Sequence, residues 1–252
     1  MSETVLEGGD LNVVVRVGDT VRRPMGEWSP AVHALLEHFE AVGFDGAPRF
    51  LGIDDQGREM LSFVAGDAAL APLPDSDDAL VELARLLRRT HEAVARFEPP
   101  ADAAWFTGGT GPLICHRDLF PPNVILREGM PVALIDWDFA GPAEALDDVI
   151  SAASHWAPLR TDAAKWGLPE DRRPERVRLL CDAYGLSAGD RARFFEQALA
   201  IRRGGYELHK RLGGDERRPG WREMWDEGSG ETILGNLRLL EELRPELEAA
   251  LS

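Results

Sequence analysis

Cysteine is scarce in this chain, and long apolar runs are absent from it. Cys115 and Cys181 are too few for a disulfide framework, and Cys115 lies in an apolar run, so we expect both to be reduced thiols in the core. No apolar run approaches the length that crosses a bilayer, and the first residues lack the charged-then-apolar pattern of a secretory signal. These absences predict a cytoplasmic protein that has no membrane partner.

Basic residues are outnumbered by acidic ones. The chain has 28 lysine and arginine residues against 44 aspartate and glutamate residues, a formal net charge of −16, and no segment is rich in lysine or arginine. A field of this sign repels nucleic acid and anionic lipid and attracts small cations. We therefore expect no nucleic-acid partner, and the charge favours a small cationic molecule; solubility alone is an equally good explanation of the acidity.

Internal repeats and low-complexity tracts are also absent. A chain of 252 residues, of which 44% are hydrophobic, can bury a sizeable core as one large domain or as two lobes. The composition therefore predicts an ordered globular protein.

The most informative segment runs from Ile114 to Leu126, and a second segment around Asp136 follows it. Together they supply two carboxylates and an amide, from Asp118, Asp136 and Asn123. Phosphoryl transfer needs a base that orients the attacking hydroxyl and ligands that hold magnesium on a triphosphate. Asp118 is our candidate for the base. Magnesium prefers oxygen ligands and takes few from the protein, so Asn123 and Asp136 are our candidates for the metal ligands.

The local sequence explains how these residues would meet. Pro121-Pro122 can neither continue a helix nor donate to a sheet ladder, so residues 116–123 should form a rigid loop. Residues 124–126 predict a strand, Glu128-Gly129 a tight turn and residues 132–135 the returning strand of a hairpin. This hairpin would bring Asp136 back beside Asn123.

The first third of the chain predicts a small antiparallel sheet with one helix. We expect strands at residues 4–6, 12–17, 20–23, 48–53 and 59–64, because turn sequences rich in glycine and aspartate separate these runs. Ser29-Pro30, followed by apolar residues at helical spacing, predicts a helix that ends near Gly43.

Helices dominate the remainder, so the predicted fold class is α+β. Residues 75–97, 174–184, 188–204 and 233–251 have helical length and apolar spacing, and glycine-rich segments separate the last two. Trp221 and Trp225 lie between those two helices. They either pack in the interior or line a pocket for a protonated amine, whose charge is attracted by aromatic faces.

A family resemblance rests on the segment around Asp118. His116-Arg117-Asp118-Leu119, followed after three residues by Asn123, resembles the catalytic-loop signature of the protein-kinase-like fold. Ile-Asp-Trp-Asp-Phe-Ala-Gly at residues 135–141, with no Ala-Pro-Glu after it, resembles the aminoglycoside phosphotransferase and choline kinase branch of that fold. The resemblance is strongest across residues 110–150.

This resemblance implies a two-lobe, protein-kinase-like fold, with an N-lobe at residues 1–64 and a C-lobe at residues 65–252. It implies transfer of a phosphoryl group from ATP, or GTP, with Mg2+, to a hydroxyl of a small, cationic, aminoglycoside-like molecule. Asp118 would be the catalytic residue, and Asn123 and Asp136 would hold the metal. Protein substrates are not expected.

The nucleotide base would lie at a hinge in this family. Ser62, Phe63 and Val64 resemble that hinge, whose backbone groups hold the adenine. Ile125 and Ile135 lie next to the metal ligands on the paired strands and would form the apolar floor beneath the base.

The first lobe departs from the family pattern. A lysine on the third strand normally neutralises the triphosphate, and a glutamate on the next helix holds it. Arg23 takes the lysine position here, with Arg22 on the opposite face of the strand. Arginine can fork onto two phosphate oxygens, so Arg23 is our candidate phosphate ligand. No glutamate stands at the expected helical turn, which contains His33. Gly8-Gly9-Asp10 could be a loop that covers the phosphates, but we favour the interpretation as an ordinary hairpin turn.

Several neighbouring residues have structural interpretations. We expect His116 to support the loop from beneath and His91 to pack in a helix interface. Asp138 is either a solvent-exposed loop residue, which we favour, or a third carboxylate that faces the metal. Asp147 and Asp148 are expected to cap or brace the helix that follows them.

Other functions fit the same residues. A kinase-like binding or immunity protein without turnover would explain the missing lysine and glutamate, although it would gain nothing from the set Asp118, Asn123 and Asp136. A metabolic kinase acting on an amino alcohol, a sugar or an amino acid is a second alternative. Nucleotidyl transfer by the same fold is a third, for which the sequence gives no positive sign.

Overall fold

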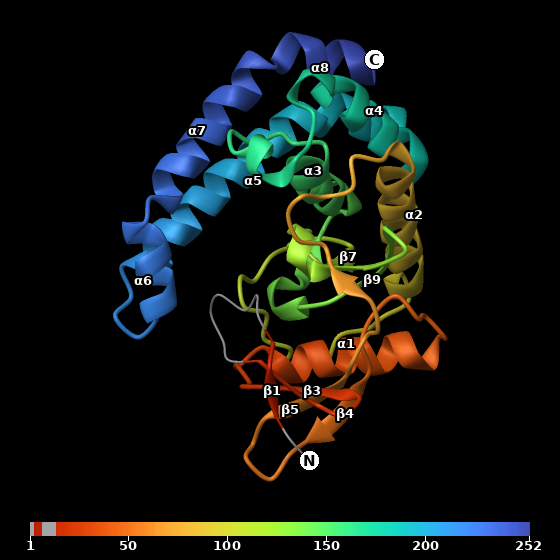
Figure 1. Ribbon diagram of the computed structural model, residues 1–252, viewed down its shortest axis with the longest axis vertical. Helices are drawn as coiled ribbons and strands as arrows, with labels where there is room; N and C mark the ends of the chain where they lie inside the picture. The colour runs from red at the N-terminus through yellow and green to blue at the C-terminus, as the bar shows by residue number, and fades with distance from the viewer. Residues whose placement is uncertain (1–2, 7–13) are drawn as a thin grey trace. The chain divides into compact units, whose positions relative to one another are not determined.

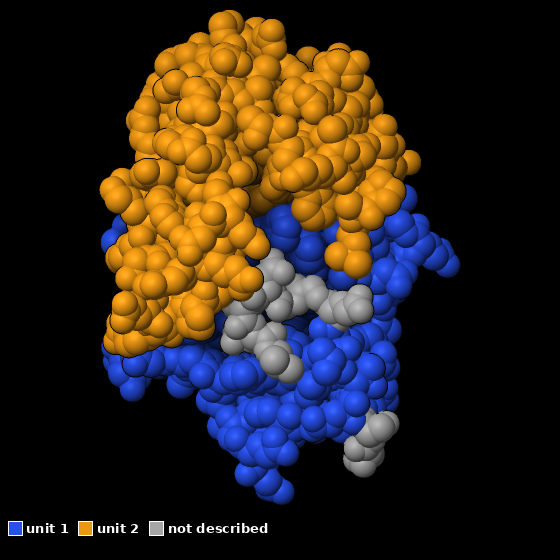
Figure 2. All heavy atoms as spheres, turned by 60° about the vertical axis from the view of Figure 1, so that its left-hand side comes forward, with its two compact units in different colours: residues 1–69, 85–148 blue, residues 70–84, 149–252 orange. Residues whose placement is uncertain are grey.

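The computed structural model describes residues 3–6 and 14–252 (Figure 1). The expected turn at Gly8-Gly9-Asp10 lies outside these residues. The chain divides into two compact units, coloured separately in Figure 2: unit 1 comprises residues 1–69 and 85–148, and unit 2 comprises residues 70–84 and 149–252. The lobe boundary expected after residue 64 stays a prediction.

A five-stranded antiparallel sheet forms the beginning of unit 1, with the order β1-β2-β3-β5-β4. Its strands are β1 (Thr4–Val5), β2 (Val15–Val17), β3 (Thr20–Arg23), β4 (Phe50–Ile53) and β5 (Glu59–Ser62). In the pairing of β3 with β5, Arg23 stands opposite Glu59. Each expected strand therefore has a counterpart, and the register places a cation beside a carboxylate.

Helix α1 (Ser29–Ala41) begins at the predicted Ser29-Pro30 and packs against the sheet (Figure 1). Its apolar spacing produces a buried face, of which Phe39 is only 1% exposed. The Phe39 ring lies 5.0 Å from that of Phe44 and 5.1 Å from that of Trp137. This helix therefore joins the first sheet to the segment that follows Asp136.

Two smaller sheets complete the strands of unit 1. One contains β6 (Asp67–Ala68), β8 (Val124–Arg127) and β9 (Met130–Leu134), and the other contains β7 (Leu113–Cys115) and β10 (Gly141–Ala143). Glu128 and Gly129 have φ values of 51° and 77°, as a two-residue hairpin with a type I′ turn requires. The Ile135 amide donates to the Asn123 carbonyl at 2.8 Å. The predicted hairpin is confirmed, and it brings Asp136 beside Asn123.

Short and long helices connect these sheets. The segments η1 (Pro121–Asn123) and η2 (Trp137–Phe139) are single turns next to the predicted metal ligands. Helix α2 (Asp77–Val94) contributes its first turns to unit 2 and the rest to unit 1, and α3 (Ala145–Trp156) is divided after Asp148.

Cys115 and Cys181 are buried free thiols, as expected.

Unit 2 is helical. It contains α4 (Arg173–Tyr184), α5 (Ala188–Gly213), α6 (Pro219–Asp226), α7 (Ser229–Glu242) and α8 (Arg244–Leu251), together with the short turns η3 (Ala163–Trp166) and η4 (Glu170–Arg172). Helices α5 and α7 lie side by side, and α6 packs on α5 (Figure 1). Within the described ranges, no helix has both the length and the apolar character that a membrane span requires.

Two helix boundaries in unit 2 differ from the prediction. Helix α5 continues through Gly204-Gly205 to Gly213, because its contacts with α6 and α7 outweigh a glycine penalty of about 1 kcal/mol per residue. The single helix expected at residues 233–251 is two helices, α7 and α8, because Pro245 cannot donate the amide bond that a continuous helix needs.

Of the two tryptophans of α6, Trp221 is buried and Trp225 is half-buried against its neighbours in unit 2. Trp221 is 6% exposed, and the Trp225 ring lies against Gly213 and Gly230. A Cβ atom at Gly213 would come within 2.6 Å of the Trp225 side chain, and one at Gly230 within 2.8 Å. Both glycines therefore make room for this ring, which favours the packing interpretation of the two tryptophans.

The interior position of Phe39 yields a stability prediction. Phe39→Ala should lower the free energy of unfolding by about 3–5 kcal/mol, because it removes a buried ring and leaves a cavity. Val42→Ala is the matched control near the end of the same helix, since Val42 is 51% exposed and a surface change should cost less than about 0.5 kcal/mol. Urea unfolding followed by circular dichroism measures both, and equal losses in the two variants would contradict the packing described.

Candidate active site

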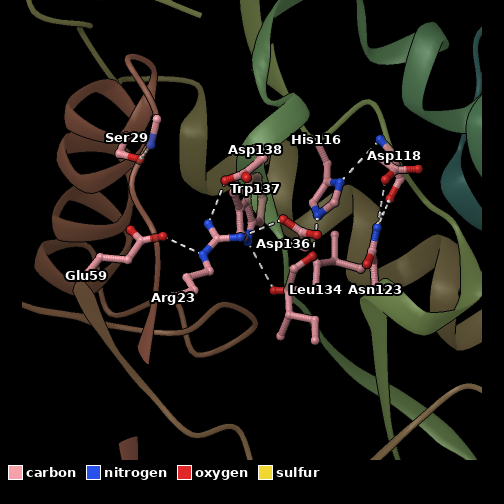
Figure 3. A network of polar contacts seen from close by, with 12 residues as sticks. Arg23, Ser29, Glu59, His116, Asp118, Asn123, Leu134, Asp136, Trp137 and Asp138 are labelled. Atoms are coloured by element: carbon pink, nitrogen blue, oxygen red, sulfur yellow. Dashed lines mark hydrogen bonds and ion pairs between the residues drawn. The ribbon is translucent and has the colours of Figure 1, made fainter. Parts of the chain in front are cut away.

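Every residue that the sequence assigns to the candidate site lies in unit 1. The loop that contains Asp118 follows β7 and ends in the turn η1. His116 is fully buried beneath it: its Nε2 donates to the Ile135 carbonyl at 2.9 Å, and its Nδ1 accepts a hydrogen bond from the Asp118 amide at 3.3 Å. The imidazole thus joins the loop to the end of the hairpin, in the supporting role expected of it (Figure 3).

Asp118 and Asn123 are joined directly. The Asn123 Nδ2 group donates to the Asp118 carboxylate at 2.9 Å and to the Asp118 carbonyl at 3.1 Å, which leaves the carboxamide Oδ1 as the atom available to a metal. Burial raises the pKa of Asp118, and the charge of Asp136 raises it further, while His116 and Asn123 oppose the rise. A carboxylate with a raised pKa is a better proton acceptor than an exposed one.

Asp136 occupies a strained position at the end of the hairpin. Its backbone has φ 59° and ψ 72°, a left-handed conformation that is uncommon for residues other than glycine. The side chain is 48% exposed, although its Oδ1 accepts a bond from Arg23. With Asn123 it forms a set of hard oxygen donors, which suits magnesium, so the residues present fit this ion.

Arg23 lies among three carboxylates (Figure 3). Its Nε donates to Glu59, its Nη1 donates to Asp136 at 2.8 Å, and its Nη2 donates to Asp138 at 2.6 Å. Burial alone would lower the pKa of Arg23, but Asp138, Asp136 and Glu59 more than offset it, so the pKa lies above the usual arginine value. Arg23 is therefore a permanent buried cation beside Asp136, the predicted metal ligand, and Asp138.

The expectation for Asp138 as a solvent-exposed loop residue is wrong. Its side chain is only 18% exposed and is ion-paired with Arg23. The physical reason is the turn η2, which directs Asp138 back toward β3 instead of outward.

A strand residue and a helix residue together replace the missing helical glutamate. Glu59, on β5, is 1% exposed and takes the carboxylate position beside Arg23. His33, at the turn of α1 where a glutamate was expected, donates from Nε2 to Glu59 at 2.6 Å, and its ring stacks on Phe50 at 3.7 Å. Helix α1 is thus linked to Arg23 indirectly, because His33 bonds to Glu59 and Glu59 bonds to Arg23.

The expected hinge lies at the end of β5. The Ser62 amide donates to the Arg49 carbonyl at 2.9 Å, and the Phe63 amide donates to the Asp19 carbonyl at 2.9 Å. The guanidinium of Arg16 stacks over the Phe63 ring in a cation–π contact, with its Cζ 3.6 Å from the ring centroid. The amides of Ser62 and Phe63 are therefore engaged within the sheet, and Val64 follows as the next half-buried residue.

Ile125 and Ile135 lie on the hairpin, as expected. Ile125 is 6% exposed, and its Cγ2 atom would come within 2.6 Å of a Cβ atom at Gly66. Gly66 has φ 138° and follows the hinge closely, so its lack of a side chain permits the approach of Ile125. Ile135 is half-buried directly before Asp136. The hairpin thus brings Ile125 close to the hinge, at Gly66, and Ile135 next to Asp136.

Sequence reasoning underestimated Asp148, which holds the loop of Asp118. The fully buried Asp148 carboxylate accepts bonds from the His116 amide at 2.8 Å, from the Arg117 amide at 2.6 Å and from His91 Nε2 at 3.0 Å. Burial alone would raise the pKa of Asp148, but these contacts outweigh it and hold the pKa below the usual aspartate value. Arg117, with φ 66°, is kept in a left-handed conformation by this contact. Asp147 caps α3 by accepting a bond from the Glu144 amide at 3.0 Å, as expected.

His91, Cys115 and Asp148 also form a compact group, with their ligand atoms within 4.8 Å of one another. Burial raises the pKa of the Cys115 thiol, and its Sγ donates to the Glu144 carbonyl at 3.3 Å. A metal needs the thiolate, and Asp148 is already bonded to backbone amides. The group is therefore a structural brace.

Comparison with known proteins gives a family. A sequence model of the phosphotransferase enzyme family matches residues 22–195, a range that includes the candidate site from Arg23 to Asp138. The trifolitoxin immunity protein of Rhizobium leguminosarum bv. trifolii is 40% identical to this chain over 212 residues, which cover 79% of this chain and 80% of that protein.

Solved structures give the fold. A microcompartment-associated aminopropanol kinase matches with a TM-score of 0.64 and 16% identity, over 100% of this chain and 94% of that one. The APH(2")-IIa complex with streptomycin and ATP matches with a TM-score of 0.54 and 11% identity, over 95% of this chain and 93% of that one. These likenesses confirm the α+β, kinase-like fold that the sequence predicts.

The contacts of Asp148 yield a prediction about stability and pH. Asp148→Asn should lower the free energy of unfolding at pH 7 by about 3–5 kcal/mol, because it removes a buried charge that two amides and His91 require. The folded-state pKa is lowered, so the contribution is complete above the unfolded pKa of about 3.9 and is lost as the pH falls through the native value. The difference between wild type and variant should therefore shrink in acid.

Asp147→Asn is the matched control for this measurement. Asp147 caps the same helix at its start, and loss of a cap costs about 1 kcal/mol. Urea titrations at a series of pH values compare the two variants. If Asp148→Asn cost no more than Asp147→Asn, Asp148 would not be the support of the loop.

Proposed function

The chain belongs to the phosphotransferase enzyme family, and from this premise we propose that it is a kinase that transfers the γ-phosphoryl group of ATP, with magnesium, to a hydroxyl of a small molecule. The observation that carries the proposal is the convergence of Asp118, Asn123 and Asp136: Asn123 bonds directly to Asp118, and Ile135, directly before Asp136, bonds to Asn123 and to His116. Such a reaction takes place where ATP is available, so we assign the protein to the cytoplasm.

The residues of the site divide the work of the reaction. Asp118 orients the acceptor hydroxyl and accepts its proton, for which its raised pKa is suitable. The Oδ1 atom of Asn123 and the carboxylate of Asp136 would hold magnesium, which neutralises charge on the triphosphate. Arg23 supplies a positive charge to the phosphates, and Glu59 and His33 keep its guanidinium in position.

The nucleotide base would lie between the hinge and the hairpin. The amides of Ser62 and Phe63 are engaged within the protein, so Val64 is the hinge residue that we assign to contact with the base. Ile125 and Ile135 supply the apolar surface beneath it. A relative in fold was solved with ATP, which supports ATP over GTP as the nucleotide.

We propose that the acceptor is cationic at one end. The net charge of −16 favours the approach of a positive molecule. The relatives in fold include an aminopropanol kinase and a protein solved in complex with streptomycin. Both of these small molecules contain basic nitrogen groups. Amino alcohols and aminoglycosides are therefore the first acceptors to screen.

Asp118→Ala tests the role of the base. Phosphoryl transfer should fall by about 10²–10⁴-fold, because the acceptor hydroxyl loses its proton acceptor, while the affinity for ATP should change little. Isothermal titration of ATP, with magnesium and then with EDTA, measures binding, and mass spectrometry of the acceptor measures transfer. Wild-type rates in the variant would remove Asp118 from the mechanism.

Arg23→Gln tests the phosphate ligand. The KM for ATP should rise at least about tenfold, because a charge-assisted contact to phosphate is lost. Arg23→Lys should recover part of the loss, since lysine keeps the charge but not the fork that reaches three carboxylates. Steady-state kinetics at saturating acceptor separates KM from kcat.

Arg22→Gln is the control for Arg23. Arg22 lies on the same strand but pairs with Asp54 at 3.7 Å instead of with the site. Its KM for ATP should remain within about twofold of wild type, because Arg22 points to the opposite face of the strand and is paired outside the site. Similar effects of both substitutions would mean that general charge, and not the position of Arg23, determines nucleotide affinity.

A second candidate function is immunity to a toxin by binding without turnover. It is favoured by the 40% identity to the trifolitoxin immunity protein and by the engagement of Asp136 with Arg23. The Asp118→Ala variant distinguishes the two candidates in a trifolitoxin-sensitive strain. Protection that disappears with Asp118 supports transfer to the toxin, whereas protection that persists in Asp118→Ala supports binding alone.

A further inference from the structure

Three arginines of unit 2 hold the loop between α3 and η3 by its carbonyl groups. Arg176 donates to the Trp156 carbonyl at 3.0 Å, Arg173 donates to the Pro158 carbonyl at 2.8 Å, and Arg202 donates to the Leu159 carbonyl at 2.7 Å. Arg173 and Arg176 lie on α4, and Arg202 lies on α5. The same backbone segment therefore receives three guanidinium groups.

Two of these arginines are neutralised and the third is not. Arg173 pairs with Glu170 at 2.8 Å, and Arg176 lies 3.4 Å from Asp75 and 3.3 Å from Asp77. Among residues 3–6 and 14–252, no carboxylate forms an ion pair with Arg202, whose hydrogen bond to Leu159 uses only one of its nitrogen atoms. A guanidinium offers several N–H donors, so most of the fork of Arg202 is available to another partner.

The nearest groups make this position more positive. Arg160 lies next to Arg202 and binds both oxygens of Asp162, through Nε and, at 2.7 Å, through Nη2. Its Nη1 donates to His155 Nδ1 at 2.7 Å. Burial, with the charges of Arg160 and Arg202, holds the pKa of His155 well below its usual value, so this imidazole is neutral near pH 7. The group thus contains two guanidinium charges and one carboxylate, whose oxygens are both occupied.

We propose that Arg202, assisted by Arg160, binds an oxyanion group of a small ligand, a carboxylate or a phosphate, in unit 2. A guanidinium fork matches the geometry of both groups. Burial and the charge of Arg160, only partly offset by the charge of Asp162, lower the pKa of Arg202 to about 10. Arg202 therefore stays charged at neutral pH, and an added anion would reduce its repulsion with Arg160. The inference does not depend on the proposed transfer reaction, because it concerns binding alone.

Ligand-dependent thermal unfolding of the full chain tests the proposal. Inorganic phosphate and succinate serve as separate probes, at constant ionic strength set with sodium chloride. In the wild type, at least one probe should raise Tm along a saturating curve, as a ligand that binds only the folded state does. In Arg202→Gln, the apparent Kd should rise at least about tenfold, because a charge-assisted contact is lost.

Arg203→Gln is the matched control. Arg203 is the next residue of α5, is exposed, and lies 3.8 Å from Glu241. Phosphate also stabilises proteins by exclusion from their surface, and that part of the effect should be the same in all three proteins. Saturation by phosphate alone identifies a phosphate ligand, and saturation by succinate identifies a carboxylate ligand.

Two outcomes would overturn the proposal. One is the absence of a saturating response to either probe in the wild type, which does not require that any variant folds. The other is the same apparent Kd in wild type, Arg202→Gln and Arg203→Gln, which would mean that the anions act on the protein surface in general. Neither outcome bears on phosphoryl transfer, which is measured separately with Asp118→Ala.

Discussion

The buried guanidinium of Arg23 is the contact on which the rest of the candidate site depends. It holds three carboxylates, from Glu59, Asp136 and Asp138, which without a cation would repel one another in a poorly hydrated space. Through these bonds it ties β3 to β5 and to the segment after β9. Asp136 nevertheless keeps 48% of its side chain exposed, so neutralisation by Arg23 does not remove it from contact with a further cation.

A second buried hydrogen-bond network, around Asp148, supports the other half of the site. Asp148 holds the amides before Asp118, and His116 joins the same loop to Ile135, directly before Asp136. Both arrangements consist of contacts between the protein's own groups. A site whose supporting contacts are already made loses less conformational freedom when its ligand binds, which is what precise positioning of a phosphoryl group requires.

The position of the cation also distinguishes this site from the pattern of lysine and glutamate expected for a kinase-like fold. Arginine can bridge several carboxylates because its planar fork has donors on different sides, whereas a lysine is a single point charge. Glu59 contacts Arg23 from the neighbouring strand β5, and His33 is the residue of α1 that bonds to Glu59. Arg23, Glu59 and His33 thus take the place of the expected lysine and glutamate, and the site keeps a positive charge beside its acidic residues.

Local sequence predicted much of this. The strands, the start of α1, the hairpin and the convergence of Asn123 with Asp136 follow from turn residues and side-chain spacing, because the residues concerned are close along the chain. The family was predicted from the loop of Asp118 and is confirmed. Boundaries failed where packing opposed local preference, as in α5, which continues through Gly204-Gly205.

The sequence by itself thus determined the fold class, the family, the loop that carries Asp118 and Asn123, and the hairpin that ends at Asp136. Only the tertiary structure decided the partners of Arg23, which are 36, 113 and 115 residues away, and the role of Asp148, which lies 57 residues from His91. Short-range geometry follows from backbone sterics and turn chemistry. Contacts between distant segments depend on strand register and helix packing, and no local pattern contains these.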